Sequence, residues 1–252
     1  MVEVISFFKN LNINEIFATI ISTFAGAWLA YKWTEKTQQG IEKRAKQEEQ
    51  QKDRENKTWQ LNYLNIFLYT HIKAFIELLQ HLQIRLGIVE KFLQAQSLSE
   101  SEHQYILSPI SEYQIDFPLN VNELLFVADD EDFIKGLVFT KTSLANYYEE
   151  IQMLNNSLSP LQVLVLSNQL TSEHIKVLKA KIRFVIEGIS YTICTFHKTL
   201  EIAKKYNEGH DKLPLNKIKE FTNEEQTSIK FASDVRQSIY KHLKQQKNAY
   251  GK

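Results

Sequence analysis

The first pattern along the chain is an apolar run near its N-terminus. Residues 13–33 read INEIFATIISTFAGAWLAYKW, and no charged residue occurs between Ile16 and Tyr31. As an α-helix, these 21 residues span roughly 31 Å, the thickness of the hydrocarbon core of a bilayer. Glu15 and Lys32 would then lie at the two interfaces. The pattern predicts a transmembrane helix over residues 13–33, preceded by an interfacial segment over residues 1–12.

The apolar run is followed by a strongly polar one. Residues 34–58 hold thirteen charges, seven basic and six acidic, with few apolar side chains. Glutamates that precede lysines by four positions favour a solvated helix. We expect a charged helical connector over residues 34–58.

Beyond this connector, apolar residues recur with steps of three and four, the period of amphipathic helices. The longest such stretch covers residues 59–96, with apolar positions at Leu61, Leu64, Leu68, Ile72, Phe75, Leu79, Leu82, Leu86, Val89 and Leu93. Further helices are predicted over residues 121–128, 129–158, 161–170, 171–206 and 222–247. Thr222 and Glu225 form a capping box for the last of them. The fold class is therefore all-α, with an antiparallel helical bundle over residues 59–247 and a tail over residues 248–252.

Basic residues near the apolar run predict its orientation. Lys9 alone precedes it, whereas five basic residues follow it closely, namely Lys32, Lys36, Lys43, Arg44 and Lys46. The positive-inside rule then predicts a bacterial inner-membrane protein with its N-terminus outside and its bundle in the cytoplasm. A cleaved signal peptide is one alternative, because residues 25–27 read Ala-Gly-Ala, although the preceding segment is poor in basic residues. A buried helix of a soluble domain is the other.

Small residues recur every four positions within the apolar run, at Ala18, Ser22, Gly26 and Ala30. Such spacing lets helices approach closely in lipid, so it predicts a homo-oligomer. Thr19, Ser22 and Thr23 could line a polar path through such an oligomer, with Glu15 at its outer mouth. The alternative is that these hydroxyls bond to their own helix backbone.

Charge changes the picture only locally, because 30 basic and 30 acidic residues cancel over the chain. We therefore expect no binding of duplex DNA. Residues 97–160 hold eleven acids and two bases, whereas residues 176–252 hold sixteen bases and eight acids. Lys176, Lys179 and Arg183 share one helical face, which could receive an anionic ligand such as a nucleotide or oligonucleotide. The alternative is that the acidic and basic parts pack against each other.

Two further clusters are candidates for chemistry. Asp129, Asp130 and Asp132 could hold a divalent metal ion, although acids at a helix start are more simply explained as caps. Arg236 and His242 have the spacing of the nuclease motif of HEPN domains, which suggests a membrane-tethered RNase as a low-ranking alternative. No zinc-protease, dinucleotide or Walker-type motif occurs in the sequence. We expect a protein that is not an enzyme and has no cofactor.

An apolar N-terminal helix, a charged connector and a helical domain together resemble the single-pass transmembrane effectors of bacterial anti-phage defence systems, such as the membrane subunit of the Hailong system. Residues 119–156 are also similar to a stretch of uncharacterised bacterial and prophage membrane proteins. The first resemblance implies a homo-oligomer that forms a gated pore or disrupts the inner membrane on an intracellular signal. The alternative is a non-enzymatic membrane scaffold that presents its bundle to a protein partner.

Overall fold

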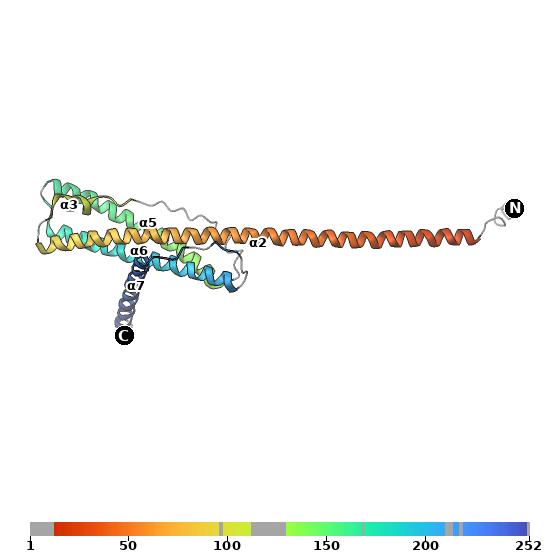
Figure 1. Ribbon diagram of the computed structural model, residues 1–252. Coiled ribbons are helices and arrows are strands. Elements are labelled where there is room, and N and C mark those ends of the chain that lie inside the picture. The colour runs from red at the N-terminus through yellow and green to blue at the C-terminus, as the bar shows by residue number, and fades with distance from the viewer. Residues whose placement is uncertain are drawn as a thin grey trace. The chain divides into compact units, whose positions relative to one another are not determined.

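The computed structural model of the chain describes residues 13–95, 98–111, 130–167, 169–209, 214–216 and 219–250. These residues form five helices and no strand (Figure 1). The helices are α2 (Ile13–Ala95), α3 (Glu100–Leu107), α5 (Glu131–Leu166), α6 (Ser172–Gly209) and α7 (Asn223–Tyr250). The all-α class is confirmed. The predicted interfacial segment 1–12 and the predicted helix 121–128 lie outside the described residues.

Helix α2 merges three predicted segments into one. The apolar run, the charged connector and the first bundle helix form a single helix of 83 residues. No proline interrupts this stretch, and the glycine at position 40 costs a helix only about 1 kcal/mol relative to alanine. The chain nevertheless divides into two compact units, Met1–Asn56 and Lys57–Lys252, so the division falls inside α2.

The predicted transmembrane helix over residues 13–33 is not supported. Among the described residues, no helix contains a stretch that is both long enough and apolar enough to cross a membrane. The reason is composition: Glu15 and Lys32 confine the uncharged part to 16 residues, and about half of these are small or hydroxylated. Sixteen residues of helix span about 24 Å, which is shorter than a typical hydrocarbon core.

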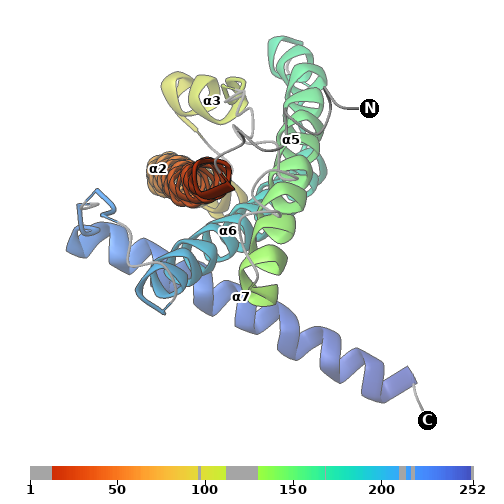
Figure 2. The same cartoon turned by 90° about the vertical axis from the view of Figure 1, so that its right-hand side faces the viewer.

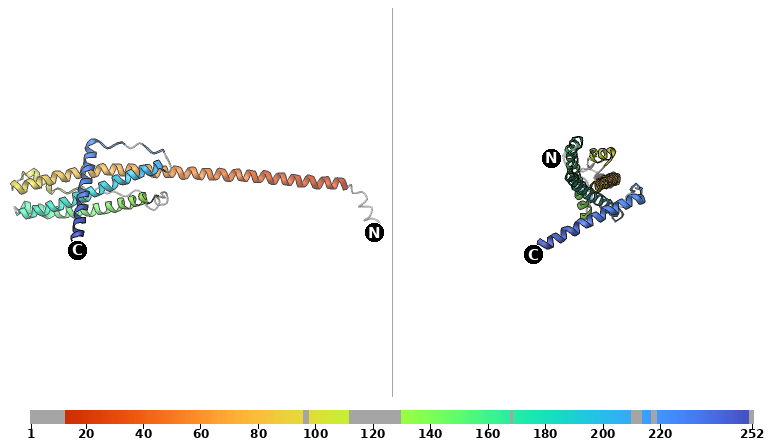
Figure 3. Two further views of the ribbon diagram at one scale, coloured as in Figure 1. Left: turned by 90° about the horizontal axis from the view of Figure 1, so that it is seen from below. Right: turned by 90° about the vertical axis from the view of Figure 1, so that its left-hand side faces the viewer.

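The bundle forms around the part of α2 that follows Lys57. Helices α5 and α6 run alongside this part of α2, as Figures 1 and 3 show. Of the ten apolar positions predicted for α2, eight are buried, and Leu86 and Leu93 are partly buried against the same core. Phe75 joins all three helices, because its ring meets Tyr147 of α5 and Phe196 of α6 edge-on at 4.9 and 5.4 Å.

Helix α5 is longer than predicted, since it continues through Pro160 to Leu166. A proline inside a helix removes one backbone hydrogen bond and costs about 3 kcal/mol. Here Pro160 is exposed, while Leu154, Leu158 and Leu161 are buried on the core face of the same turns. Burial of these leucines stabilises the helix by more than the proline costs, at roughly 1.5–3 kcal/mol per side chain.

Helix α7 crosses α6 at a steep angle, as Figures 2 and 3 both show. The predicted capping box is confirmed: Thr222 N donates to Glu225 at 2.7 Å, and Glu225 N donates to Thr222 Oγ1 at 3.3 Å. The Glu225 carboxylate also forms an ion pair with Lys73 of α2, at 2.9 Å. The helix extends to Tyr250, so the predicted tail from residue 248 is helical over its first three residues.

Candidate functional site

The apolar part of α2 is exposed at every position from Phe17 to Trp33. The exposed fraction reaches 75% for Phe24 and 78% for Trp33. Because a helix turns by about 100° per residue, six bulky side chains share one face, and Leu29 and Trp33 lie off it. The six are Phe17, Ile20, Ile21, Phe24, Trp28 and Tyr31. In the described part of the chain nothing covers this face, which is therefore a contiguous apolar surface.

The predicted small residues Ala18, Ser22, Gly26 and Ala30 lie on the other side of this segment. A Cβ atom added at Gly26 would meet nothing within 4 Å, so this side of the helix is open. Ser22 Oγ and Thr23 Oγ1 both donate to the carbonyl oxygen of Thr19, at 3.0 and 2.7 Å. These two hydroxyls are satisfied within their own helix and do not require a polar path. The side chain of Glu15 lies outside the described part of the chain.

The predicted anionic-ligand face on α6 is engaged by carboxylates. Lys176 pairs with Glu173 one turn earlier at 2.6 Å. Lys179 and Arg183 pair with Glu90 of α2 at 2.9 and 2.8 Å. The Lys179 ammonium, with help from Arg183, lowers the pKa of Glu90 below its ordinary value. Lys179 and Arg183 therefore join α6 to α2, whereas Lys176 pairs within α6.

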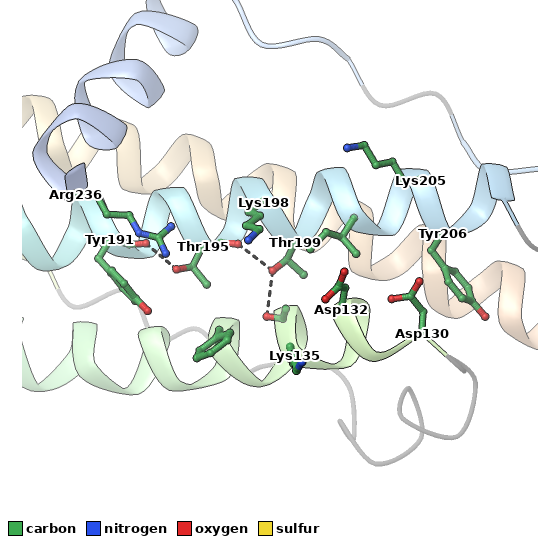
Figure 4. Close-up of a pocket in the computed structure, with 13 residues that line it drawn as sticks. Asp130, Asp132, Lys135, Tyr191, Thr195, Lys198, Thr199, Lys205, Tyr206 and Arg236 are labelled. Atoms are coloured by element: carbon green, nitrogen blue, oxygen red, sulfur yellow. Dashed lines mark hydrogen bonds between the residues drawn. The ribbon is translucent and has the colours of Figure 1, made fainter. Parts of the chain in front are cut away.

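A different basic group gathers around a cavity of about 390 Å³ between α5, α6 and α7. Figure 4 shows its lining. Helix α6 contributes one stripe of residues spaced by three and four, namely Tyr191, Thr195, Lys198, Ile202 and Lys205. Helix α5 contributes its first turns, and α7 contributes Arg236. The cavity is thus built from residues of three consecutive helices.

The two ends of this cavity differ in their side chains. Figure 4 shows Arg236, Tyr191, Thr195 and Lys198 towards one end, and Asp130, Asp132, Lys205 and Tyr206 towards the other, so that only the second end carries carboxylates. Lys135 also lines the cavity, but it pairs with the exposed Glu131 at 2.6 Å. Among the described residues, Lys198, Lys205 and Arg236 form no ion pair with a carboxylate.

The floor of the cavity is a buried threonine network. Thr199 Oγ1 donates to the carbonyl oxygen of Gly136 at 3.1 Å and lies 3.0 Å from Thr140 Oγ1. A Cβ atom at position 136 would lie only 3.1 Å from Thr199 Oγ1, so glycine is what lets α5 and α6 approach so closely here. The network fixes the spacing of the two helices and hence of the cavity walls.

Arg236 is held in place by aromatic rings. Its guanidinium lies 4.9 Å from the ring centre of Tyr191 and 5.6 Å from that of Tyr240. Cation–π contacts of this kind orient an arginine without neutralising it. Partial burial is the largest single effect and opposes ionisation, but the interactions with Tyr240, Cys194 and Tyr191 together outweigh it, so the pKa of Arg236 lies above its usual value. A fixed positive charge therefore faces the cavity.

The structure separates the remaining candidate residues. Arg236 lines the cavity, whereas His242 is exposed and does not. Asp130 caps α5, since its Oδ1 accepts from Phe133 N at 2.9 Å, and Asp132 is exposed in the first turn. Asp129 lies outside the described residues, among which no group of three or more potential metal ligands occurs. The capping interpretation of Asp130 is confirmed.

A second polar feature lies between α5 and α6, away from the cavity. The carboxylate of Glu150 occupies the space that a Cβ atom would fill at Gly188 of α6. No described group donates a hydrogen bond to its buried Oε2. Burial, with smaller contributions from the negative charges of Glu149 and Glu187, raises the pKa of Glu150 to about 7.

Sequence reasoning did not find the cavity. The spacing of Tyr191, Thr195, Lys198 and Lys205 was visible in the sequence, but apolar and basic residues at such spacing are typical of many solvated helix faces. Only the crossing of α7 brings Arg236 to this stripe. Comparison with protein-family models, with curated proteins and with solved structures finds no match to this chain. The fold and the sites define a helical bundle protein with an exposed apolar N-terminal helix, and its function must be argued from its own geometry.

Proposed function

We propose that this protein is a membrane-bound helical effector. The apolar segment 13–33 of α2 enters the lipid bilayer, several copies associate there through their small residues, and the bundle receives the signal. One observation carries the proposal: bulky apolar side chains from Phe17 to Tyr31 form one face that no described part of the chain covers. Burial of such a face contributes about 25 cal/mol per Å² of apolar area, so its most stable environment lies outside water.

Three features favour lipid over an aqueous protein partner. Trp28, Tyr31 and Trp33 stand at the end of the segment, where aromatic residues of membrane helices meet the headgroups. The hydroxyls of Ser22 and Thr23 already have acceptors in their own helix, so lipid would leave neither unsatisfied. The charged residues 34–58 follow at once and are exposed almost throughout, as a water-facing connector requires.

The short length of the uncharged part sets how the segment would enter. At about 24 Å it reaches across a bilayer only if Lys32 extends its ammonium to the interface or the bilayer thins locally. The basic residues after the segment support a cytoplasmic location of the bundle under this proposal. The gated pore and the role in anti-phage defence stay predictions, because the resemblance that suggested them transfers no residue.

Membrane fractionation tests the proposal. The full chain should remain with membranes after an alkaline carbonate wash and leave them only in detergent. Phe24→Asp should move the protein into the wash, since an acid at the centre of an inserted helix costs about 2.5–3.5 kcal/mol and the aromatic contact is also lost. Ile41→Asp is the matched control: Ile41 is a 62% exposed apolar residue of the same helix, but it lies in the charged connector. This control should stay with the membranes.

Two outcomes would reject lipid insertion. One is wild-type protein in the carbonate wash, and the other is a Phe24→Asp variant that stays with the membranes. If the wild-type protein is found in the wash as an oligomer that Phe24→Asp dissociates, the apolar face binds a second copy of this chain in water instead.

A further inference from the structure

The cavity between α5, α6 and α7 has the chemistry of a ligand site. A volume of about 390 Å³ lies within the usual range for small-molecule sites. Lys198 and Arg236 place two positive charges towards one end, and neither has a carboxylate partner among the described residues. In the same bundle, Lys179 and Arg183 differ from these two residues, because they share the carboxylate of Glu90.

The opposite end selects against a simple anion. Asp130 and Asp132 line the cavity there, beside the ring of Tyr206 (Figure 4). Carboxylates accept hydrogen bonds from hydroxyl and amino groups, and they repel phosphate. A nucleic-acid strand needs a positively charged groove along its whole backbone, and these two acids interrupt it. The occupant must therefore be short, with an anionic end and a hydrogen-bond-donating end.

The aromatic residues of the lining indicate a flat body between these ends. Phe139, Tyr191 and Tyr206 all contribute to the walls. The Tyr206 ring is held by stacking on Phe133 at 5.3 Å, and Tyr191 is held under the Arg236 guanidinium. Rings fixed in this way can stack on a planar group of a ligand without losing further freedom.

We propose that this cavity binds a small organic monophosphate with hydrogen-bond donors at its far end, the chemistry of a nucleoside monophosphate. The phosphate lies between Arg236 and Lys198. Hydroxyl or amino groups of the ligand donate to Asp132 and to Asp130. The proposal concerns the bundle alone and stands whether or not residues 13–33 enter lipid; if both hold, the ligand is the signal that the effector receives.

Calorimetric titration of the detergent-solubilised full chain tests the proposal. The probes are the four common ribonucleoside monophosphates, with inorganic phosphate and adenosine as partial ligands. At least one monophosphate should bind with a dissociation constant below about 1 mM, and at least tenfold more tightly than either partial ligand, because it alone reaches both ends of the cavity.

Single substitutions test which residues bind each end of the ligand. Lys198→Ala and Arg236→Gln should each weaken binding of the monophosphate at least tenfold, since each removes a charge-assisted contact to phosphate. Lys204→Ala is the matched control, because Lys204 is exposed on the same helix and does not line the cavity; its effect should be less than twofold. Asp132→Asn should weaken binding of the monophosphate, because it removes a hydrogen-bond acceptor. It should strengthen binding of inorganic phosphate, because it removes a repulsive charge.

The competing explanations predict different results. Equal binding of inorganic phosphate and of the best monophosphate would reduce the cavity to a general anion site and overturn the proposal. Binding that is unchanged in Lys198→Ala would also overturn it, and this variant tests the site even if Arg236→Gln fails to fold, because Lys198 is exposed. Binding of anionic lipid vesicles that depends on Lys198 while no monophosphate binds would assign the phosphate to a lipid headgroup and overturn it as well.

Discussion

Helix α2 carries two apolar surfaces that differ in burial and in the state of the polar groups near them. From Leu61 to Val89 its apolar residues are buried in the bundle, while from Phe17 to Trp33 they are exposed. Polar groups show the reverse: the hydroxyls of Ser22 and Thr23 have partners in their own helix, whereas Glu150 in the bundle has a buried oxygen without one. In the bundle the apolar residues of α2 are packed, and Glu150 is a buried polar group without a donor. In the N-terminal segment these two hydroxyls have acceptors, and the apolar face is uncovered.

The largest expected effect comes from exchanging one aromatic residue in each surface. Phe75→Ala should destabilise the bundle by about 3–5 kcal/mol, because it empties the space between Tyr147 and Phe196. Phe24→Ala should leave the free energy of unfolding of the bundle within about 0.5 kcal/mol of the wild type. Chemical denaturation in detergent, followed by circular dichroism, measures both. A large effect of Phe24→Ala on unfolding would mean that the segment packs on the bundle, and the contrast would be lost.

The next effect concerns the small side of the exposed segment. Gly26→Leu fills the open space opposite the bulky face, where a Cβ atom meets nothing within the chain. Association of copies through small residues should weaken by about 1–2 kcal/mol, roughly tenfold, as interhelical packing is lost. Mass measurement of the detergent-solubilised protein over a range of concentrations reports this change. Gly40→Leu, in the charged connector, should leave the oligomer unchanged; equal behaviour of the two variants would remove self-association from the proposal.

Local periodicity predicted the buried surface of α2 well, because steps of three and four directly state which residues share a helical face. The Thr222–Glu225 capping box was equally readable, since both partners lie within one turn. The length of α2 and α5 could not be predicted in the same way. Neither the change in composition at residue 34 nor Pro160 ends a helix, because neighbouring turns supply enough burial or helix propensity to continue it.

The candidate site was beyond sequence reasoning for a different reason. Lys179 and Lys198 lie on the same basic helix, and nothing in their spacing says which of them meets a carboxylate. The answer depends on Glu90, about ninety positions away from Lys179, and on the crossing angle of α7, which brings Arg236 to Tyr191. Pairing over such distances follows from tertiary packing. For the same reason the anionic-ligand face predicted at Lys176, Lys179 and Arg183 lies about two to eight turns from the cavity residues of α6.

A third prediction concerns the strained polar group of the bundle. The pKa of Glu150, about 7, lies above its ordinary value of 4.5, so the folded state binds this proton more tightly than the unfolded state. The contribution of Glu150 to stability should be greatest below about pH 4.5, fall as the pH rises to about 7, and then level off. After allowance for solvent screening at a partly exposed group, the fall attributable to Glu150 is about 1–2 kcal/mol.

Glu150→Gln should abolish this fall. The variant should be more stable than the wild type by about 1–2 kcal/mol at pH 8 and nearly equal to it at pH 4.5, because the amide carries no charge at either pH. Thermal unfolding at the two pH values measures the difference. Glu77→Gln, at an exposed position of α2, is the control and should change neither value. A variant that is less stable than the wild type at pH 8 would show that the buried oxygen has a donor in solution.

The smallest expected effect separates the helix propensity at position 188 from the cost of burying the Glu150 carboxylate. Gly188→Ala places a methyl group where the Glu150 carboxylate now lies, and this flexible side chain can move into solvent. The variant should gain about 0.5–1 kcal/mol from helix propensity, as should Gly87→Ala, where a Cβ atom meets nothing within 4 Å. Only Gly188→Ala should also lose the dependence on pH, so that adding Glu150→Gln to it brings no further gain at pH 8. If the two substitutions are instead additive, the carboxylate does not rest against Gly188, and the strained polar group that distinguishes the bundle from the N-terminal segment is absent.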